Sequence, residues 1–313
     1  MNLHVLIERY IALQQALGKP FVGNAPRLRS FARAFGPDVA IGDLTREQVS
    51  SFLTNGGPLT RNYHVKYSIL RGFYRYAHSR GYIDAIPLPT LIPKQPPPFR
   101  PYIYSHEELR RLLAVTDCLQ CGRSGLEPAT MRTVLLLLYG AGLRISEALA
   151  LNRQDVDLEH SLLTVHASKF FQSRLVPLAA ALSRALSDYA TSSSRCLLGD
   201  QPAFFTSRSG ERVRSRAVQE CFRRGCERAG VRRGDGARYQ PRLHDLRHSF
   251  AVHRLTSWYR QGADVQALLP HLCVYLGHRN LAATQVYLSM TPELLAEASA
   301  RFERYSRKEG GDA

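Results

Sequence analysis

Arg144 occupies a position in the chain from which it could bind a phosphate group. It lies in the segment GAGLRISEAL, residues 140–149, where a glycine break precedes an expected helix. A guanidinium at a helix start can bind a phosphate that also accepts hydrogen bonds from free helix N–H groups. Glu147 follows three residues later. Taken alone, the segment is better explained by an exposed Arg144–Glu147 pair of little energetic value.

A second segment, HDLRH at residues 244–248, places imidazole and guanidinium groups on one helix face. His244 and Arg247 are three residues apart and therefore neighbours on that face. Such a pair suits an anion that must be bound and must also exchange protons. His244 and His248 could instead bind a metal ion. Arg247 on the same face argues against a cation there, and no carboxylate stands in a metalloprotease-like position.

A third segment, LGHRNLAATQVY at residues 276–287, contains His278 directly after a glycine and Tyr287 nine residues later. A tyrosine taken at random is usually a core residue, so Tyr287 alone predicts little. Lys169 is the only lysine between Lys94 and Lys308. A function that requires a titratable amine in that part of the chain therefore has one candidate, in the turn of an expected hairpin between strands 161–166 and 174–178.

Together these segments resemble the active site of the tyrosine recombinases, also called phage integrases. The family's order of site residues is Arg, Lys, His-x-x-Arg, His, Tyr, and this chain has Arg144, Lys169, His244, Arg247, His278 and Tyr287. Each motif is weak by itself, but the combination is specific. The resemblance extends over nearly the whole chain, because the N-terminal part is similar to the family's core-binding domain.

The resemblance implies a role for each of these residues. Arg144 and Arg247 would neutralise the non-bridging oxygens of a phosphodiester. His244 and His278 would add hydrogen bonds and help to move the proton of the nucleophile. Tyr287 would attack the phosphorus and form a covalent 3′-phosphotyrosine. Because this link preserves the bond energy, rejoining would need no cofactor, and the arginine charges would make a metal ion unnecessary.

Lys169 would be the acid that protonates the leaving 5′-oxygen. In the family this lysine often follows a glycine, whereas Ser168 precedes it here. The stretch between Arg247 and His278 is also several residues longer than in compact Xer-type members. In this respect the chain is similar to recombinases carried by transposons and other mobile elements.

The charge of the chain favours a polyanionic partner. Lys and Arg number 42 against 26 Asp and Glu, and the net charge is +16. Residues 1–95 carry +7 and residues 96–313 carry +9, so the excess is not confined to a tail. Such a balance indicates nucleic acid or an anionic membrane. Arginine provides 37 of the basic residues, which a GC-rich genome explains as well as phosphate recognition does.

The composition excludes several other classes of protein. An apolar content of 44% and a charged content of 22% are typical of folded proteins with a core. The densest apolar run, residues 134–138, is far shorter than the roughly 20 residues that cross a bilayer. The N-terminal residues do not resemble a secretory signal, so we expect a cytoplasmic protein with reduced cysteines. Cys118 and Cys121 have metal-ligand spacing, but a structural zinc site requires a second such pair, and Cys221 and Cys226 are spaced more widely.

A proline-rich segment divides the chain. Seven of the 15 residues at 87–101 are proline, a composition that favours an extended spacer. Apolar residues at helical spacing and a capping box at 45–48 predict that residues 1–86 form a helical bundle, similar to the SAM-like core-binding domain of the family. Residues 102–313 would form the catalytic domain, with helices at 131–139, 179–190, 215–229, 243–261, 263–269, 281–288 and 292–306. The expected fold class is mainly α with a small antiparallel β-sheet, α+β.

The resemblance implies double-stranded DNA as substrate and a tetramer of protomers on two duplexes, with accessory recombinases as further partners and no membrane. In the family a C-terminal helix docks on a neighbouring protomer; packing on its own domain is the alternative for residues 292–304. Integration, excision or transposition of a mobile element is the expected role. Xer-type resolution of chromosome or plasmid dimers, relaxation by a type IB topoisomerase and a catalytically dead DNA-binding relative remain alternatives.

Overall fold

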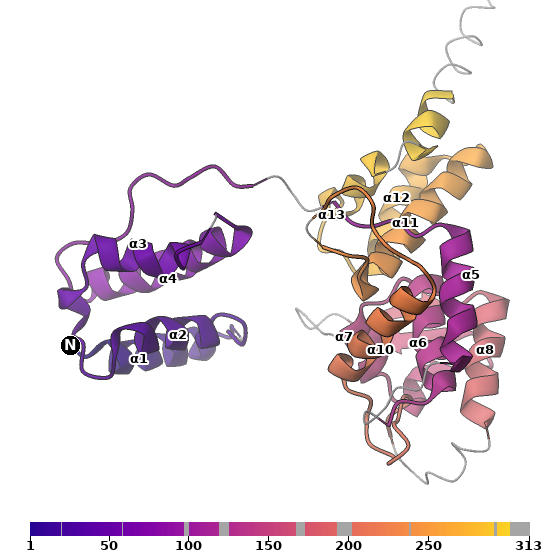
Figure 1. Ribbon diagram of the computed structural model, residues 1–313, viewed down its shortest axis with the longest axis horizontal. Coiled ribbons are helices and arrows are strands. Elements are labelled where there is room, and N and C mark those ends of the chain that lie inside the picture. Colours follow the sequence, from indigo (N-terminus) through magenta and orange to yellow (C-terminus); the bar gives the residue numbers. More distant parts are fainter. Residues whose placement is uncertain are drawn as a thin grey trace, which may run out of the picture. The chain divides into compact units, whose positions relative to one another are not determined.

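The computed structural model describes residues 1–19, 21–57, 59–96, 100–118, 125–166, 173–192, 202–237, 239–290 and 293–300. The chain divides into two compact units, Met1–Phe99 and Arg100–Ala313. Figure 1 shows the elements of both. Among the described residues, no helix is both long enough and apolar enough to span a membrane. Lys169 lies outside the described residues, as do Cys121 and Phe302.

The N-terminal unit consists of helices around one apolar core. Its α-helices are α1 (Leu3–Ala16), α2 (Ala25–Phe35), α3 (Arg46–Thr54) and α4 (Arg61–Ser79), with a short 3₁₀ turn at Ile41–Asp43. The expected capping box is confirmed: the Thr45 side chain accepts from the Gln48 N–H, and the Gln48 side chain accepts from the Thr45 N–H. Leu6, Phe31 and Phe73 are fully buried where the helices meet, so apolar burial holds the bundle together.

The first residues after α4 also pack on this unit. Leu88 is buried in the N-terminal core, and the Tyr67 hydroxyl donates a hydrogen bond of 3.1 Å to the Pro89 carbonyl. Part of the segment 87–101 therefore covers the bundle, because an apolar side chain next to an open core gains more from burial than from solvent exposure.

The C-terminal unit is mixed, and its fold class is the predicted one: mainly helical with one small antiparallel sheet. The elements are α5 (His106–Ala114), α6 (Pro128–Gly140), α7 (Ile145–Ala150), β1 (Val156–Asp157), β2 (Leu162–Val165), β3 (Arg174–Pro177), α8 (Ala180–Thr191), α10 (Ser215–Arg228), α11 (Leu243–Arg260), α12 (Val265–Leu276) and α13 (Ala282–Gln285). Short 3₁₀ turns occupy Val115–Cys118, Arg153–Asp155 and Val286–Ser289. The three strands pair in the order β1-β2-β3, and Val165 of β2 lies opposite Arg174 of β3.

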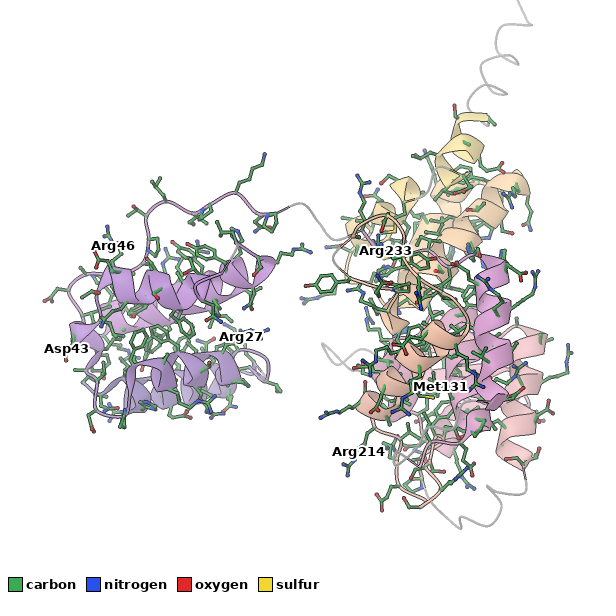
Figure 2. The ribbon with its side chains drawn as sticks, in the orientation of Figure 1. Arg27, Asp43, Arg46, Met131, Arg214 and Arg233 are labelled. Atoms are coloured by element: carbon green, nitrogen blue, oxygen red, sulfur yellow. The ribbon has the colours of Figure 1, made fainter. Side chains whose placement is uncertain are left out.

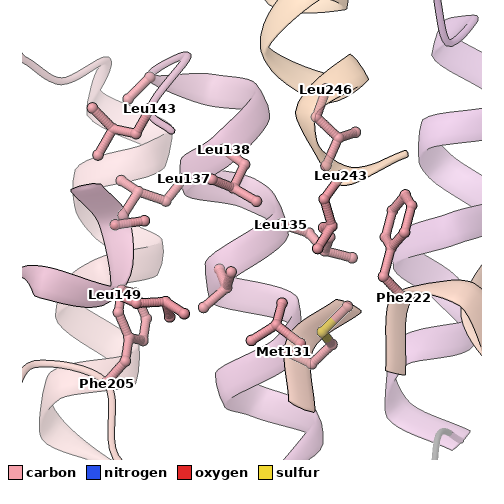
Figure 3. Packing of buried hydrophobic residues seen from close by; sticks show 14 of the residues in the cluster. Met131, Leu135, Leu137, Leu138, Leu143, Leu149, Phe205, Phe222, Leu243 and Leu246 are labelled. Carbon is pink, nitrogen blue, oxygen red and sulfur yellow. The ribbon is translucent and has the colours of Figure 1, made fainter. Parts of the chain in front are cut away.

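Helix α6 forms the centre of this unit. Its apolar residues are buried on nearly all sides, as expected for a helix enclosed by others. Figure 3 shows Met131 and Leu135 of α6 close to Leu243 of α11 and to Phe222 of α10. In Figure 2, Met131 lies inside the unit, whereas Arg214 is exposed at its surface. The apolar core thus holds α11 firmly against α6.

Helix α12 differs from the sequence-based prediction. The expected helix ends at residue 269, directly before Pro270, but α12 continues to Leu276 with Pro270 inside it. Leu272 and Leu276 are buried beyond the proline, and this burial offsets the hydrogen bond that the proline removes. The expected helix 281–288 is also split, since α13 ends at Gln285 and a 3₁₀ turn carries Tyr287.

Residues 293–300 are helical and pack on their own unit. Leu294 is fully buried in the cluster formed with α11 and α12, and Glu297 pairs with Arg260 at 2.8 Å. Leu295, by contrast, is half exposed. One face of this segment therefore packs against its own unit, whereas Leu295 faces solvent.

Candidate active site

Arg144 lies at the start of α7, and its position depends on the turn before that helix. Gly142 adopts a φ of +60°, which a residue with a Cβ atom rarely adopts. The Arg144 Nη1 atom donates to Glu147 Oε1 at 2.6 Å, and its Nη2 atom donates to the Gly277 carbonyl at 3.2 Å. The Glu147 side chain is only 1% exposed. The alternative of an exposed Arg144–Glu147 pair is therefore wrong.

Arg247 is buried on α11 and is held mainly by backbone oxygens. Its guanidinium donates to the carbonyls of Gly142, at 2.7 Å, and of Leu276. Its Nη1 atom lies 3.8 Å from Glu147 Oε2, beyond ordinary hydrogen-bond distance. Burial lowers the pKa of Arg247 to about 10, so the group remains charged at neutral pH. Arg144 and Arg247 come from segments that are distant in the sequence, and their guanidinium groups both lie close to Glu147.

His244 and His248 follow each other on the same face of α11, one turn apart. Their ring centroids are 4.8 Å apart, and the His248 ring lies 5.6 Å from that of Tyr287. Burial, followed by the charge of the neighbouring His244, lowers the pKa of His248 to about 3. Desolvation and the Arg247 charge also lower the pKa of His244, although this residue is exposed at the surface. Both rings are therefore neutral at pH 7, and each has one ring nitrogen that can accept a hydrogen bond.

His278 follows the C-cap of α12, and Tyr287 lies in the 3₁₀ turn after α13. Their rings stack with centroids 6.0 Å apart. The Nδ1 atom of His278 pairs with the buried Thr284 hydroxyl at 2.8 Å, which fixes the orientation of the ring. Burial and then the Arg247 charge lower the pKa of His278 to about 4.

Tyr287 is nearly inaccessible, with 3% of its surface exposed. Burial raises the pKa of its hydroxyl, while the charge of Arg247 and a hydrogen bond from it act in the opposite direction. A phenol in this state stays protonated at neutral pH until a neighbouring base takes its proton. Imidazole rings, such as the neutral histidines around it, are the side chains that most often act as such a base.

Five of the six predicted site residues therefore lie together. Arg144, His244, Arg247, His278 and Tyr287 are linked by the contacts above and come from α7, α11 and the segment after α12. Lys169 lies outside the described residues, in the connection between β2 and β3. The last residue of β2, Val165, and the first of β3, Arg174, flank this connection.

Two further residues of the site were not predicted from the sequence. Arg174 donates to both oxygens of Glu147, at 3.2 and 2.9 Å. Thr284 orients His278, as described above. The sequence contained a signal for Glu147, namely its spacing from Arg144. It contained none for Arg174, whose partner is distant in the sequence, or for Thr284, whose contact with His278 depends on the conformation of the turn between them.

No group of three or more His, Cys, Asp or Glu residues that could hold a metal ion occurs in the part of the chain that the structure describes. The side chain of Cys118 is outside that part, as is Cys121. Cys226 and Cys273 are free, whereas Cys221 is disulfide-bonded, so the expectation of reduced cysteines is wrong for Cys221. The prediction of chemistry without a metal ion remains to be tested.

Comparison with known proteins identifies the class of molecule that this fold and site represent. Residues 104–293 match the model of the phage integrase family. The integrase/recombinase y4rE of Sinorhizobium fredii is 36% identical over 302 residues, which cover 94% of each chain. Tyrosine recombinase XerA of Thermococcus kodakarensis is 31% identical over 270 residues, 83% of each chain. The chain belongs to the phage integrase family, the tyrosine-type site-specific DNA recombinases.

Solved structures agree with this fold. A lambda integrase dimer bound to a COC′ core site matches with a TM-score of 0.67 and 17% identity, over 93% of this chain and 78% of that one. The integrase of transposon Tn1549, in complex with a circular intermediate DNA, also matches with a TM-score of 0.67, at 15% identity, over 97% and 99% of the two chains. At these identities the likeness concerns the fold alone.

Proposed function

We propose that this protein cuts and rejoins double-stranded DNA through a covalent 3′-phosphotyrosine at Tyr287. The observation that carries the proposal is the environment of this hydroxyl. It is buried beside the Arg247 guanidinium and between the rings of His248 and His278. Burial alone would suit a core tyrosine, but a core tyrosine has no need of a buried cation and two neutral imidazoles around it.

The chemistry follows from these groups. The Tyr287 oxygen attacks the phosphorus, a new P–O bond forms, and the P–O5′ bond breaks. His244 and His278 add hydrogen bonds and help to move the phenolic proton, and Lys169 supplies a proton to the departing 5′-oxygen. Arg144 and Arg247 stabilise the charge on the non-bridging oxygens. Attack by a free 5′-hydroxyl on the phosphotyrosine reverses each step and restores the DNA.

The wider role is proposed from the relatives. Extensive similarity to y4rE, together with the fold shared with the Tn1549 integrase, supports the integration, excision or transposition of a mobile element. The solved relatives include a lambda integrase tetramer bound to a Holliday junction. We therefore propose a tetramer on two duplexes, acting on DNA in the cytoplasm, with accessory recombinases as further partners and with the helical unit 1–86 as a second DNA-binding element.

The decisive experiment uses a suicide substrate, a duplex nicked near the cleavage site so that the leaving strand diffuses away. The wild-type protein should form an adduct that survives denaturing electrophoresis. Tyr287→Phe, which lacks only the phenolic oxygen, should bind the duplex but form no adduct. Tyr259→Phe is the matched control, since it makes the same change in the same unit outside the site, and it should form the adduct normally. An adduct with Tyr287→Phe would refute the proposal.

A further inference from the structure

Arg174 is a largely buried arginine whose contacts join the β2–β3 hairpin to the site. Its side chain is 14% exposed. The Nη1 and Nη2 atoms donate to Glu147 Oε1 and Oε2, at 3.2 and 2.9 Å, in a two-pronged arrangement. Its Nε atom donates to the Tyr275 carbonyl at 2.9 Å, close to Gly277 and His278. One guanidinium therefore binds both a carboxylate under the site and the end of α12.

Glu147 is the only carboxylate that the structure's ion pairs place among these arginines within the described residues. Burial opposes its ionisation, but hydrogen bonds from Arg174 and Arg144 hold its pKa at about 2. At neutral pH it is thus an anion shielded from solvent, surrounded by three guanidinium groups. Its exact position decides how much positive charge is available to a phosphate.

The contacts of Glu147 are divided unequally among the three arginines. Arg174 and Arg144 both hydrogen-bond to it, whereas Arg247 stays at 3.8 Å and donates to backbone carbonyls instead. A modest shift of the carboxylate toward Arg247 would tighten this 3.8 Å ion pair into a hydrogen-bonded one. The tighter pair would cancel more of the charge on the arginine that hydrogen-bonds the Tyr287 hydroxyl.

We propose that Arg174 is a positioning residue for strand cleavage: it holds both Glu147 oxygens and so keeps the carboxylate from closing its 3.8 Å ion pair with Arg247 into a direct hydrogen bond. With Arg174 in place, one anion and three cations leave a net double positive charge. Without it, a single net charge remains, and the carboxylate is free to approach Arg247. The inference rests on the proposed function, since it concerns the charge that Arg144 and Arg247 present to the scissile phosphate.

The test compares Arg174→Met, which keeps the bulk of the side chain without its charge, with Arg174→Lys, which keeps the charge without the two-pronged geometry. Arg110→Met is the matched control, because Arg110 forms an exposed pair with Glu107 at 3.1 Å, outside the site. In single-turnover adduct formation on the suicide substrate, Arg174→Met should be slower by on the order of 10²-fold, the cost of misplaced catalytic groups. Arg174→Lys should also be clearly slower, and Arg110→Met unchanged.

A second substrate separates positioning from a loss of folding. Replacing one non-bridging oxygen of the scissile phosphate with a methyl group gives a neutral methylphosphonate, which has little charge for the arginines to stabilise. If Arg174 acts through that charge, the defect of Arg174→Met should shrink strongly on this substrate. A defect of equal size on both substrates would mean a merely structural role and would overturn the proposal.

The remaining outcomes also test the inference. Wild-type rates for Arg174→Met or Arg174→Lys would overturn the inference. If Arg174→Met does not fold, as judged by thermal unfolding, Arg174→Lys on the two substrates supplies the same comparison. Failure of the wild-type protein to form any adduct would instead refute the proposed function, so the two failures are distinguishable.

Discussion

The Arg247 guanidinium donates a hydrogen bond of 2.7 Å to the carbonyl oxygen of Gly142, a residue 105 positions earlier in the chain. This bond joins α11 to the turn that begins α7, and therefore joins the two arginines proposed to bind one phosphate. Because Arg247 is buried, its hydrogen bonds to backbone carbonyls replace the solvation that it loses. The geometry of the Gly142 turn is thus part of the site.

The first prediction concerns this turn. Gly142→Ala should destabilise the protein, because φ is +60° and the new Cβ would lie 2.6 Å from Phe250 Cδ1 and 2.9 Å from Leu276 Cδ2. Strain and overpacking together should cost ~2 kcal/mol or more of the free energy of unfolding. Gly262→Ala is the control, since Gly262 has a φ of +71° but no atom near its Cβ position. Denaturant unfolding should show a loss of only ~1 kcal/mol for the control. Equal losses would contradict the clash.

The second prediction concerns Lys169 as the acid. Lys169→Ala should slow cleavage strongly with nearly unchanged DNA affinity, because many basic residues share the phosphate contacts. Replacing the bridging 5′-oxygen of the substrate with sulfur provides a leaving group that needs no proton. This substrate should restore cleavage by Lys169→Ala but not by Arg144→Ala, whose charge is still missing. Restoration of both variants, or of neither, would exclude Lys169 as the acid.

The third prediction concerns metal ions. Because guanidinium groups are proposed to meet the phosphate charge, adduct formation should proceed at the same rate in excess EDTA. The measurement is the single-turnover rate with and without the chelator. If chelation stops the reaction and magnesium restores it, the arginines are not sufficient.

The fourth prediction concerns acid stability and a histidine away from the site. The His253 ring lies against that of His106 with centroids 4.4 Å apart, and its Nδ1 atom pairs with the Tyr139 hydroxyl at 2.9 Å. Burial, then the charges of His106 and Arg260, lower the pKa of His253 from 6.5 to about 4. Between these two pH values the unfolded chain binds a proton that the folded chain does not, so stability falls as the pH decreases from 6.5 toward 4.

His253→Asn keeps a polar group near the position of Nδ1 but cannot titrate in this range. The free energy of unfolding of this variant, measured at several pH values between 7 and 4.5, should therefore decrease less steeply with acidification than that of the wild type. Parallel curves for the two proteins would show that His253 does not contribute to the pH dependence.

Much of the fold was predictable because its signals are local. The helix of residues 3–16 follows from the spacing of its apolar residues, and the start of α3 follows from the capping box at Thr45. The expected end of α12 at residue 269 was wrong because it, too, came from a local signal. A local rule stops a helix at proline, whereas the burial of Leu272 and Leu276 depends on distant partners.

For the candidate site, the sequence alone determined the residue types, their order and the family. Motifs around Arg144, His244 and His278 are short stretches whose spacing can be read directly. The chain order could not show that Glu147 is buried beneath three arginines, that Thr284 orients His278, or that Arg174 binds Glu147 from 27 residues away. These relations arise only when α7, β3, α11 and the end of α12 pack together, because burial and ion pairing depend on distances in space and not on separation along the chain.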